Sequence, residues 1–372
     1  MPSGRVVVVT GGNRGIGLAI VRGLLAAASD VLVVLTSRSL EKGNEARRLL
    51  FAEGAAQNRV HVLQLDVSDS ISIVEAAKAI AAHYAPIYAL VNNAGVGLDL
   101  PWCSRPLAAS VAEETLRANF TGAVEMCEAF APLLVPGGRI VNVSSGAGSM
   151  NMDKMSREKR SLLMRESDLS VAALQVCRDE FLGAFKRLHA ADEPSLPQMG
   201  EEGWWMQAYG FSKALLNAYT RVLARAWPAL QVCACTPGFV ATDMTHGYSQ
   251  VGGCRPVISS AVVRQGIVAM QLVADVLDRK WQADALKSTS EGAETPIFLV
   301  LAAADDLSSG AFYGDSQVRE SGCVHVCVGL VCVVCLSVYT LHHTHNLPLS
   351  HTLTQSLTQD IRPWCTQPYD VA

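Results

Sequence analysis

The stretch Thr10-Gly11-Gly12-Asn13-Arg14-Gly15-Ile16-Gly17 decides the fold of this chain. It follows an apolar, β-branched run and opens a segment with helical spacing. Gly11 lets the chain turn out of the strand, Gly15 lets backbone approach a pyrophosphate, and Gly17 lets the helix pack closely on the sheet. The start of the helix offers free N–H groups and a positive dipole end to phosphates. A plain tight turn is the alternative, but a position between a strand and a helix favours a dinucleotide site.

Strand and helix signals alternate on both sides of this turn. Short apolar runs rich in β-branched residues predict strands over 5–10, 30–35, 60–65, 88–91, 139–143 and 230–235. Helical spacing predicts helices over 16–28, 70–83 and 209–227. Continuous apolar strands separated by amphipathic helices imply a parallel sheet covered on both faces. We therefore predict an α/β protein with a Rossmann-like, doubly wound parallel sheet in a single domain over residues 1–320.

Two stretches interrupt the alternation. Residues 146–203 are polar and helix-forming, and residues 246–290 contain an apolar, helix-compatible run over 262–281. Each is too short to bury a core of its own securely. We predict that both are helical insertions of the same domain and that they cover the mouth of the sheet.

Composition limits the possible partners and the compartment. A formal net charge of −4, without a long basic run, predicts no binding to nucleic acid or to an acidic membrane. The chain runs almost directly into the first strand and the glycine turn, so removal of a signal peptide would destroy the motif. The cysteines before residue 320 lie in apolar contexts, where cysteine behaves as a small hydrophobe rather than as part of a disulfide framework. We therefore expect a cytoplasmic protein.

The end of the second strand indicates which nicotinamide cofactor fits. An acid at this position would hold the ribose 2′-hydroxyl of NAD, but the sequence reads Leu35-Thr36-Ser37-Arg38. Arg38 and Arg14 can instead form charge-assisted hydrogen bonds to a 2′-phosphate. A single surface arginine is usually only solvated, so the prediction of NADPH/NADP+ depends on the pair and on the missing acid.

The ends of the third and fourth strands suit the same ligand. Asp66-Val67 follows the third strand, where Asp66 can bind the adenine edge or can cap the helix that begins at Ser70. Asn92-Asn93-Ala94-Gly95 ends the fourth strand. Small residues there leave room for a cofactor, and Asn93 can fix neighbouring backbone.

A second group of residues predicts chemistry. Tyr209-Gly210-Phe211-Ser212-Lys213 places Tyr209 and Lys213 four positions apart, on one face of a predicted helix. Such pairs are common on helices and alone mean little. Val141-Asn142-Val143-Ser144-Ser145 puts hydroxyls at the carboxyl end of a strand, where open α/β folds build their sites. Asn119 lies on the helix before this strand, where it is either a site residue or a polar residue that bends the helix.

These motifs resemble, in type and order, those of the short-chain dehydrogenases/reductases, and in finer detail those of the NADPH-dependent carbonyl reductases. The resemblance covers about residues 4–320. It rests on Thr10–Gly17 with the following Leu18-Ala19-Ile20-Val21-Arg22, on Asn92–Gly95, Asn119, Ser145, Glu202-Gly203-Trp204, Tyr209, Lys213, Pro237-Gly238-Phe239-Val240-Ala241-Thr242-Asp243-Met244 and Glu291-Gly292-Ala293-Glu294-Thr295-Pro296. It implies a small-molecule carbonyl substrate, NADPH as cofactor, and cofactor contacts from Pro237, Gly238 and Thr242. We expect no metal site.

The resemblance further implies a catalytic tetrad. Tyr209 would donate a proton to the carbonyl oxygen, with its pKa lowered by Lys213 and the oxidised nicotinamide. Lys213 would also hold the nicotinamide ribose, and Asn119 would anchor a water that relays protons to it. Ser145, rather than Ser144, would bind the substrate oxygen, because the family usually uses the second of the two serines. Strand alternation also lets only one of the two face the cofactor.

The same resemblance bears on assembly and on the substrate. A long helical segment separates Ser145 from Tyr209, as in the carbonyl reductases, where it would cover the surface that other members use to form tetramers. We therefore expect a monomer. Phe239 stands where tryptophan is typical, and Trp205 and Met206 are unusually bulky. These departures leave the identity of the carbonyl substrate open.

Residues 321–372 differ from the rest of the chain. The run over 322–341 is uncharged, apolar and long enough to span a bilayer. Its valine–cysteine alternation and the following His342-His343-Thr344-His345 are what a translated dinucleotide repeat would give. We therefore expect a disordered or read-through tail, with a membrane anchor as the alternative. A metal site at the histidines is not expected, because no surrounding fold would hold them.

Two other functions remain compatible with the sequence. One is a dehydrogenase of the same fold that acts on another alcohol or on a steroid-like substrate. The other is a catalytically silent NADP-binding scaffold, although a pure sensor would have no need of Ser145, Tyr209 and Lys213.

Overall fold

The computed structural model describes residues 4–100, 103, 108–165, 167–188, 199–246, 286–314 and 317–318. All of them belong to one compact unit. The predicted helical run over 262–281, most of the insertion over 246–290 and the tail over 321–372 lie outside the described residues.

One sheet organises the described residues, with the strand order β3-β2-β1-β4-β5-β6-β7-β8. Its strands are β1 Arg5–Val9, β2 Val31–Ser37, β3 Val60–Gln64, β4 Ile87–Asn92, β5 Leu134–Val143, β6 Gln231–Thr236, β7 Phe312–Gly314 and β8 Gln317–Val318. All neighbouring pairs are parallel except β7 and β8, which pair antiparallel. The order reverses between β1 and β4, which is where open α/β sheets bind their ligands. The prediction of a doubly wound parallel sheet is confirmed.

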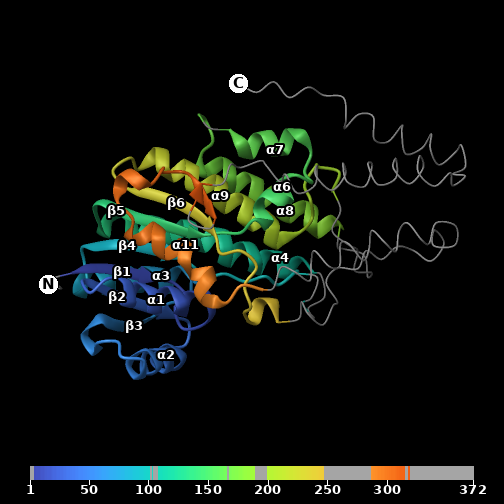
Figure 1. Cartoon of the computed structure of the whole chain (residues 1–372). Helices are drawn as coiled ribbons and strands as arrows, with labels where there is room; N and C mark the ends of the chain where they lie inside the picture. Colours follow the sequence, from blue (N-terminus) through green and yellow to red (C-terminus); the bar gives the residue numbers. More distant parts are fainter. Residues whose placement is uncertain are drawn as a thin grey trace, which may run out of the picture. The chain divides into compact units, whose positions relative to one another are not determined.

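Helices cover both faces of this sheet (Figure 1). They are α1 Gly15–Ala27, α2 Leu40–Ala52, α3 Ser70–His83, α4 Ala109–Leu116, α5 Gly122–Phe130, α6 Ala147–Met152, α7 Arg157–Met164, α8 Val171–Leu188, α9 Ala208–Ala226 and α11 Thr289–Leu301. Alternate residues of β1 belong to two apolar cores: Val7 and Val9 pack with α1, α2 and α11, and Val6 and Val8 pack with α3, α5 and α9. Burial on both faces explains why β1 is a continuous valine run rather than an alternating one.

The described helices of the 146–203 insertion pack beside α9 (Figure 1). Phe181 of α8 stacks on Phe211 of α9 with 4.0 Å between ring centroids, and Trp204 meets the same ring edge-on at 5.1 Å. All three aromatic side chains are fully buried. The described part of the insertion therefore thickens the helical layer beside the sheet. That the insertion covers the mouth of the sheet stays a prediction.

Candidate active site

The glycine turn between β1 and α1 has the backbone that its spacing predicts. Gly11 and Gly15 have φ angles of +63° and +54°, in the left-handed region that side chains disfavour. A Cβ on Gly17 would lie 2.2 Å from the Gly11 carbonyl oxygen, so only glycine lets α1 begin this close to the turn. A Cβ on Gly15 would meet only the Thr242 methyl group, at 3.6 Å, among the described residues. The Gly15 side of the turn is therefore open enough for a ligand.

The start of α1 suits an anion. Arg14 occupies the N-cap position with an extended backbone, and no described side chain caps the helix or places an acid in its first turn. The first N–H groups and the positive end of the helix dipole therefore remain available for a phosphate. Nearby on β2, the buried Thr36 hydroxyl has no hydrogen-bond partner within the described ranges, while the Thr36 carbonyl accepts from Gly12 N at 3.0 Å. These features fit a dinucleotide.

The two arginines predicted to meet a 2′-phosphate are both exposed. Arg38 directly follows β2, and its carbonyl accepts a hydrogen bond from Gln64 Nε2 at 3.2 Å. Arg14 forms an ion pair with Asp243, a partner that the sequence reasoning missed. Both side chains of this pair are largely solvent-exposed, at 66% and 77%. An exposed ion pair contributes little stability, so Arg14 can exchange Asp243 for a phosphate at low cost.

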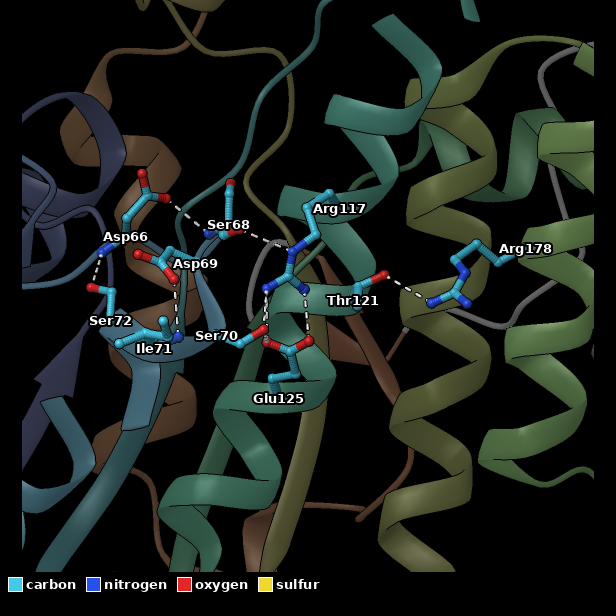
Figure 2. A network of polar contacts seen from close by, with 10 residues as sticks. All are labelled: Asp66, Ser68, Asp69, Ser70, Ile71, Ser72, Arg117, Thr121, Glu125 and Arg178. Atoms are coloured by element: carbon cyan, nitrogen blue, oxygen red, sulfur yellow. Dashed lines mark hydrogen bonds and ion pairs between the residues drawn. The ribbon is translucent and has the colours of Figure 1, made fainter. Parts of the chain in front are cut away.

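The loop after β3 is ordered by its own side chains (Figure 2). Asp66 accepts a hydrogen bond from Ser68 N at 2.8 Å, and Asp69 accepts from Ile71 N at 2.9 Å. Asp69 is therefore the N-cap of α3. The alternative that Asp66 caps this helix is wrong, because the chain makes one more tight turn before the helix begins at Ser70. Adenine binding by Asp66 stays a prediction.

An arginine ties this loop to the segment that carries Asn119 (Figure 2). Arg117 donates to the Ser68 carbonyl at 3.0 Å and pairs with Glu125 through two contacts of 2.8 Å. A Cβ on Gly122 would lie 2.2 Å from the Val67 carbonyl oxygen, so the start of α5 and the loop after β3 are in close contact. The predicted adenine loop and the segment around Asn119 therefore form one packed unit.

Asn119 lies in a π-helical turn, Arg117–Thr121, between α4 and α5. Its Oδ1 accepts from Val96 N and its Nδ2 donates to Val96 O, both at 2.8 Å. Nδ2 also donates to the Ser212 hydroxyl at 3.0 Å, on the helix that carries Tyr209. Single π turns inside helices are frequent at functional sites. The Asn119 amide therefore joins the loop after β4 to α9. That Asn119 anchors a water that relays protons to Lys213 stays a prediction.

The end of β4 holds the glycine turn in place. Asn93 Nδ2 donates to the Thr10 carbonyl at 2.9 Å, and the Thr10 hydroxyl accepts from the N–H groups of Asn93 and Ala94 at 2.9 Å. A Cβ on Gly95 would lie 3.1 Å from Asn119 Oδ1 and 3.6 Å from Lys213 Nζ. Asn93 thus fixes backbone as predicted from sequence, and a glycine at position 95 keeps side-chain atoms away from Asn119 and Lys213.

Ser145, Tyr209 and Lys213 meet beyond the end of β5. The Tyr209 phenol and the Ser145 hydroxyl lie near enough to each other for Ser145 to lower the pKa of the tyrosine. Lys213 Nζ donates to the Val143 carbonyl at 3.0 Å and lies 5.8 Å from the centre of the Tyr209 ring. Ser144 is buried, and its hydroxyl donates to the Lys213 carbonyl at 3.4 Å. Ser145, and not Ser144, therefore faces the tyrosine.

Burial determines the ionisation of this group. It lowers the pKa of Lys213 from 10.5 to about 8, because a charged ammonium loses its hydration there. It raises the pKa of Tyr209, against a smaller lowering by the hydrogen bond with Ser145 and together with a small upward contribution from the charge of Asp99. The sequence predicts that Lys213 lowers the tyrosine pKa. In the protein alone this is not what the structure shows, since desolvation of the phenol dominates.

The loop after β6 contains the remaining predicted cofactor residues. Gly238, next to Pro237, has a φ of +79° and requires glycine. Thr242 caps a short 3-10 turn, Asp243–Thr245, and reaches the glycine turn through its methyl group. Within the described residues no cluster of His, Cys, Asp or Glu could hold a metal, and none of the helices there is long and apolar enough to cross a membrane.

Comparison with known proteins identifies the family. The family model for short chain dehydrogenases matches residues 5–157. A curated relative, (+)-neomenthol dehydrogenase of Arabidopsis thaliana, is 31% identical over 337 residues, which cover 85% of this chain and 98% of the relative. The chain belongs to the short-chain dehydrogenase/reductase family. Another member, carbonyl reductase [NADPH] 1 of Homo sapiens, is 31% identical over 329 residues, covering 86% of this chain and all of the relative.

Comparison with a solved structure agrees with this assignment. Salutaridine reductase from Papaver somniferum superposes with a TM-score of 0.63 at 28% sequence identity. The match covers 83% of this chain and 99% of that protein. The family resemblance drawn from the sequence motifs is therefore confirmed.

Proposed function

We propose that this protein is an NADPH-dependent carbonyl reductase that transfers a hydride to aldehydes or ketones and yields alcohols. The observation that carries the proposal is the arrangement of Ser145, Tyr209 and Lys213, which lie together beyond the end of β5. A pure binding scaffold would not need a buried lysine and a half-buried tyrosine beside a serine hydroxyl. The similarity to proteins named carbonyl reductase [NADPH] and (+)-neomenthol dehydrogenase supports the same reaction class.

The glycine turn and the strand ends around it hold the cofactor. Backbone N–H groups from Asn13 to Gly17 bind the pyrophosphate, with Ile16 at the start of α1. Arg38 and Arg14 bind the 2′-phosphate, which distinguishes NADPH from NADH. The loop at Asp66 and Val67 contacts the adenine. When bound, the cofactor supplies the hydride.

Further cofactor contacts come from the loops after β4 and β6. These residues are Asn93, Gly95, Pro237, Gly238 and Thr242. Their support is positional: the β4 loop lies against the glycine turn and Lys213, and Thr242 lies against Gly15.

The residues of the chain handle the proton. Ser145 donates a hydrogen bond to the substrate oxygen and orients it. Tyr209, kept protonated by its raised pKa, donates its proton to that oxygen. Lys213, with a pKa of about 8, exchanges protons near neutral pH and returns one to the tyrosine. Asn119 connects this relay to water.

The oligomeric state and the cellular compartment belong to the same proposal. The protein acts as a monomer, because α6, α7 and α8 pack over α9. Family members that lack this insertion would associate through the surface that it covers here. The protein resides in the cytoplasm, which agrees with the free state of the described cysteines.

A panel of aldehydes and ketones tests the proposed reaction. Each compound is mixed with NADPH and the protein, and loss of the reduced cofactor is compared with formation of the alcohol. We expect at least one compound to give equal amounts of oxidised cofactor and alcohol, with much slower reaction with NADH. Tight NADPH binding without turnover on any carbonyl would instead favour the silent scaffold.

A further inference from the structure

A buried carboxylate lies at the start of the helix that carries Tyr209. Asp99 follows β4, is only 6% exposed and comes from a loop more than a hundred positions away in the sequence. Its Oδ1 accepts a hydrogen bond from Tyr209 N at 3.0 Å, and its Oδ2 accepts one from Ala208 N. The next N–H of the helix, on Gly210, donates to Gln207 Oε1 at 2.7 Å. Two different side chains therefore cap α9, and only one of them binds Tyr209 itself.

The loop that supplies Asp99 also contacts the rest of the site. Three residues earlier, Val96 exchanges two hydrogen bonds with the Asn119 amide. Next to it, Gly95 leaves the space beside Lys213 Nζ open. The loop after β4 thus connects the π turn at Asn119 with the first turn of α9, and Asp99 is its contact with the helix.

The chemistry of the contact explains why it holds strongly. A buried carboxylate is stable only when hydrogen-bonded, and here it accepts two N–H groups at the positive end of a 19-residue helix. Hydrogen bonds to an ionised acceptor are roughly twice as strong as neutral ones. The position of the Tyr209 backbone determines where its phenol lies relative to Ser145. A displacement of the reacting group by about 1 Å can lower the reaction rate about a hundred-fold.

We propose that Asp99 is a positioning residue of the reaction: it anchors the backbone of Tyr209 so that the phenol stays aligned with Ser145. This inference rests on the proposed function, since it gives Tyr209 a proton to deliver. Asp99 binds the backbone N–H groups at the start of α9, and in this proposal it acts on the reaction through the tyrosine.

The charge of Asp99 has a second effect on the same residue. Among the described groups that face Tyr209, Ser145 lowers the pKa of the phenol, Lys213 lies over the ring, and Asp99 carries the negative charge. Cys235, on β6, lies close enough to Lys213 to interact with it. Burial and then the Asp99 carboxylate raise the pKa of Tyr209. The tyrosine is thereby kept protonated, in the form that can donate.

The test compares Asp99→Asn with Gln207→Ala. The asparagine keeps the size of Asp99 but loses the charge and leaves one backbone N–H facing a donor. We expect Asp99→Asn to lower kcat for reduction about ten-fold or more, with the KM for NADPH changed less than about two-fold. Because reduction needs protonated Tyr209, the fall of kcat at alkaline pH should begin at a lower pH. Gln207→Ala removes a cap from the same helix end without touching Tyr209 N, so it should lower thermal stability and leave the pH profile in place.

Two further measurements keep the outcome decisive. If Asp99→Asn does not fold, Asp99→Glu replaces it: the charge stays, the geometry changes, and kcat should fall without a shift of the pH profile. Ultraviolet difference titration of the phenols, with Tyr209→Phe as reference, follows the pKa of Tyr209 without turnover. This titration needs no turnover, so it tests the role of Asp99 even if the wild type reduces no carbonyl. Absence of carbonyl reduction by the wild type would refute the proposed function, but not the effect of Asp99 on Tyr209. Wild-type kcat and titration in Asp99→Asn would overturn the inference, as would identical effects of Gln207→Ala.

Discussion

Replacing Lys213 with methionine should make the protein more stable and inactive. Burial lowers the pKa of Lys213 from 10.5 to about 8. One pH unit corresponds to about 1.4 kcal/mol, so keeping the ammonium charged at neutral pH costs the folded state about 3 kcal/mol. Methionine has a similar length and no charge. It also removes the hydrogen bond from Nζ to the Val143 carbonyl, 3.0 Å long, which offsets about 1 kcal/mol. The free energy of unfolding should therefore rise by about 2 kcal/mol.

The stability difference between Lys213→Met and the wild type should shrink as the pH rises. Below about pH 8 the lysine is protonated in both the folded and the unfolded states, and the full cost is present. As the pH rises from 8 toward 10.5, the folded state releases its proton first and the cost disappears. The stability of the wild type should therefore approach that of Lys213→Met across this range.

Urea unfolding followed by tryptophan fluorescence measures the difference. The comparison is made near neutral pH and again near pH 9.5, with Lys78→Met as control, because the Lys78 side chain is 68% exposed. The control should change stability by less than about 0.5 kcal/mol at either pH. Carbonyl reduction by Lys213→Met should fall by about a hundred-fold or more. Two results would refute the reasoning. One is a Lys213→Met variant no more stable than the wild type near neutral pH, and the other is a stability difference between the two that stays the same near pH 9.5.

Three other changes test the cofactor site. Arg38→Ala should lower kcat/KM for NADPH about ten-fold or more and leave NADH nearly unaffected; equal losses would mean that Arg38 does not bind the 2′-phosphate. Asp243→Asn releases Arg14 from its ion pair, so the Kd for NADPH should fall about three-fold while that for NADH stays constant; a weaker NADPH complex would mean that the pair itself shapes the site. Gly17→Ala places a Cβ 2.2 Å from the Gly11 carbonyl oxygen and should lower both thermal stability and NADPH affinity in calorimetry, and wild-type values would contradict the close packing of α1 on the turn.

Sequence patterns predicted most of the sheet and its central helices. The helix expected over 70–83 coincides with α3, Ser70–His83, because its Asp69 cap and apolar spacing are local signals. The glycine turn was equally predictable, since each glycine answers a local steric demand. By contrast, β7 and β8 are too short, at three and two residues, to show a period. β7 pairs with β6, which is distant in the sequence, and β8 pairs only with β7.

The site was predictable as a set of residues but not as a set of contacts. The π turn at Asn119 has no local sequence signal; it lies directly before Gly122, which packs against the Val67 loop. Asp99 and Asp243 were missed for a similar reason: an acid in a loop is ordinarily solvated, and only the fold brings these two to Tyr209 and Arg14. The raised pKa of Tyr209 likewise depends on burial, which the Tyr-x-x-x-Lys spacing does not report.

Transfer of deuterium from NADPH deuterated at the reactive ring carbon tests the central claim most directly. The wild type and Tyr209→Phe are each incubated with the labelled cofactor and a carbonyl compound, and the alcohol is analysed by mass spectrometry. We predict one deuterium on the carbinol carbon with the wild type and at least a hundred-fold slower formation of alcohol with Tyr209→Phe, which should bind NADPH with nearly unchanged affinity. Unlabelled alcohol from the wild type, or a Tyr209→Phe variant that keeps more than about a tenth of the wild-type rate, would contradict the account.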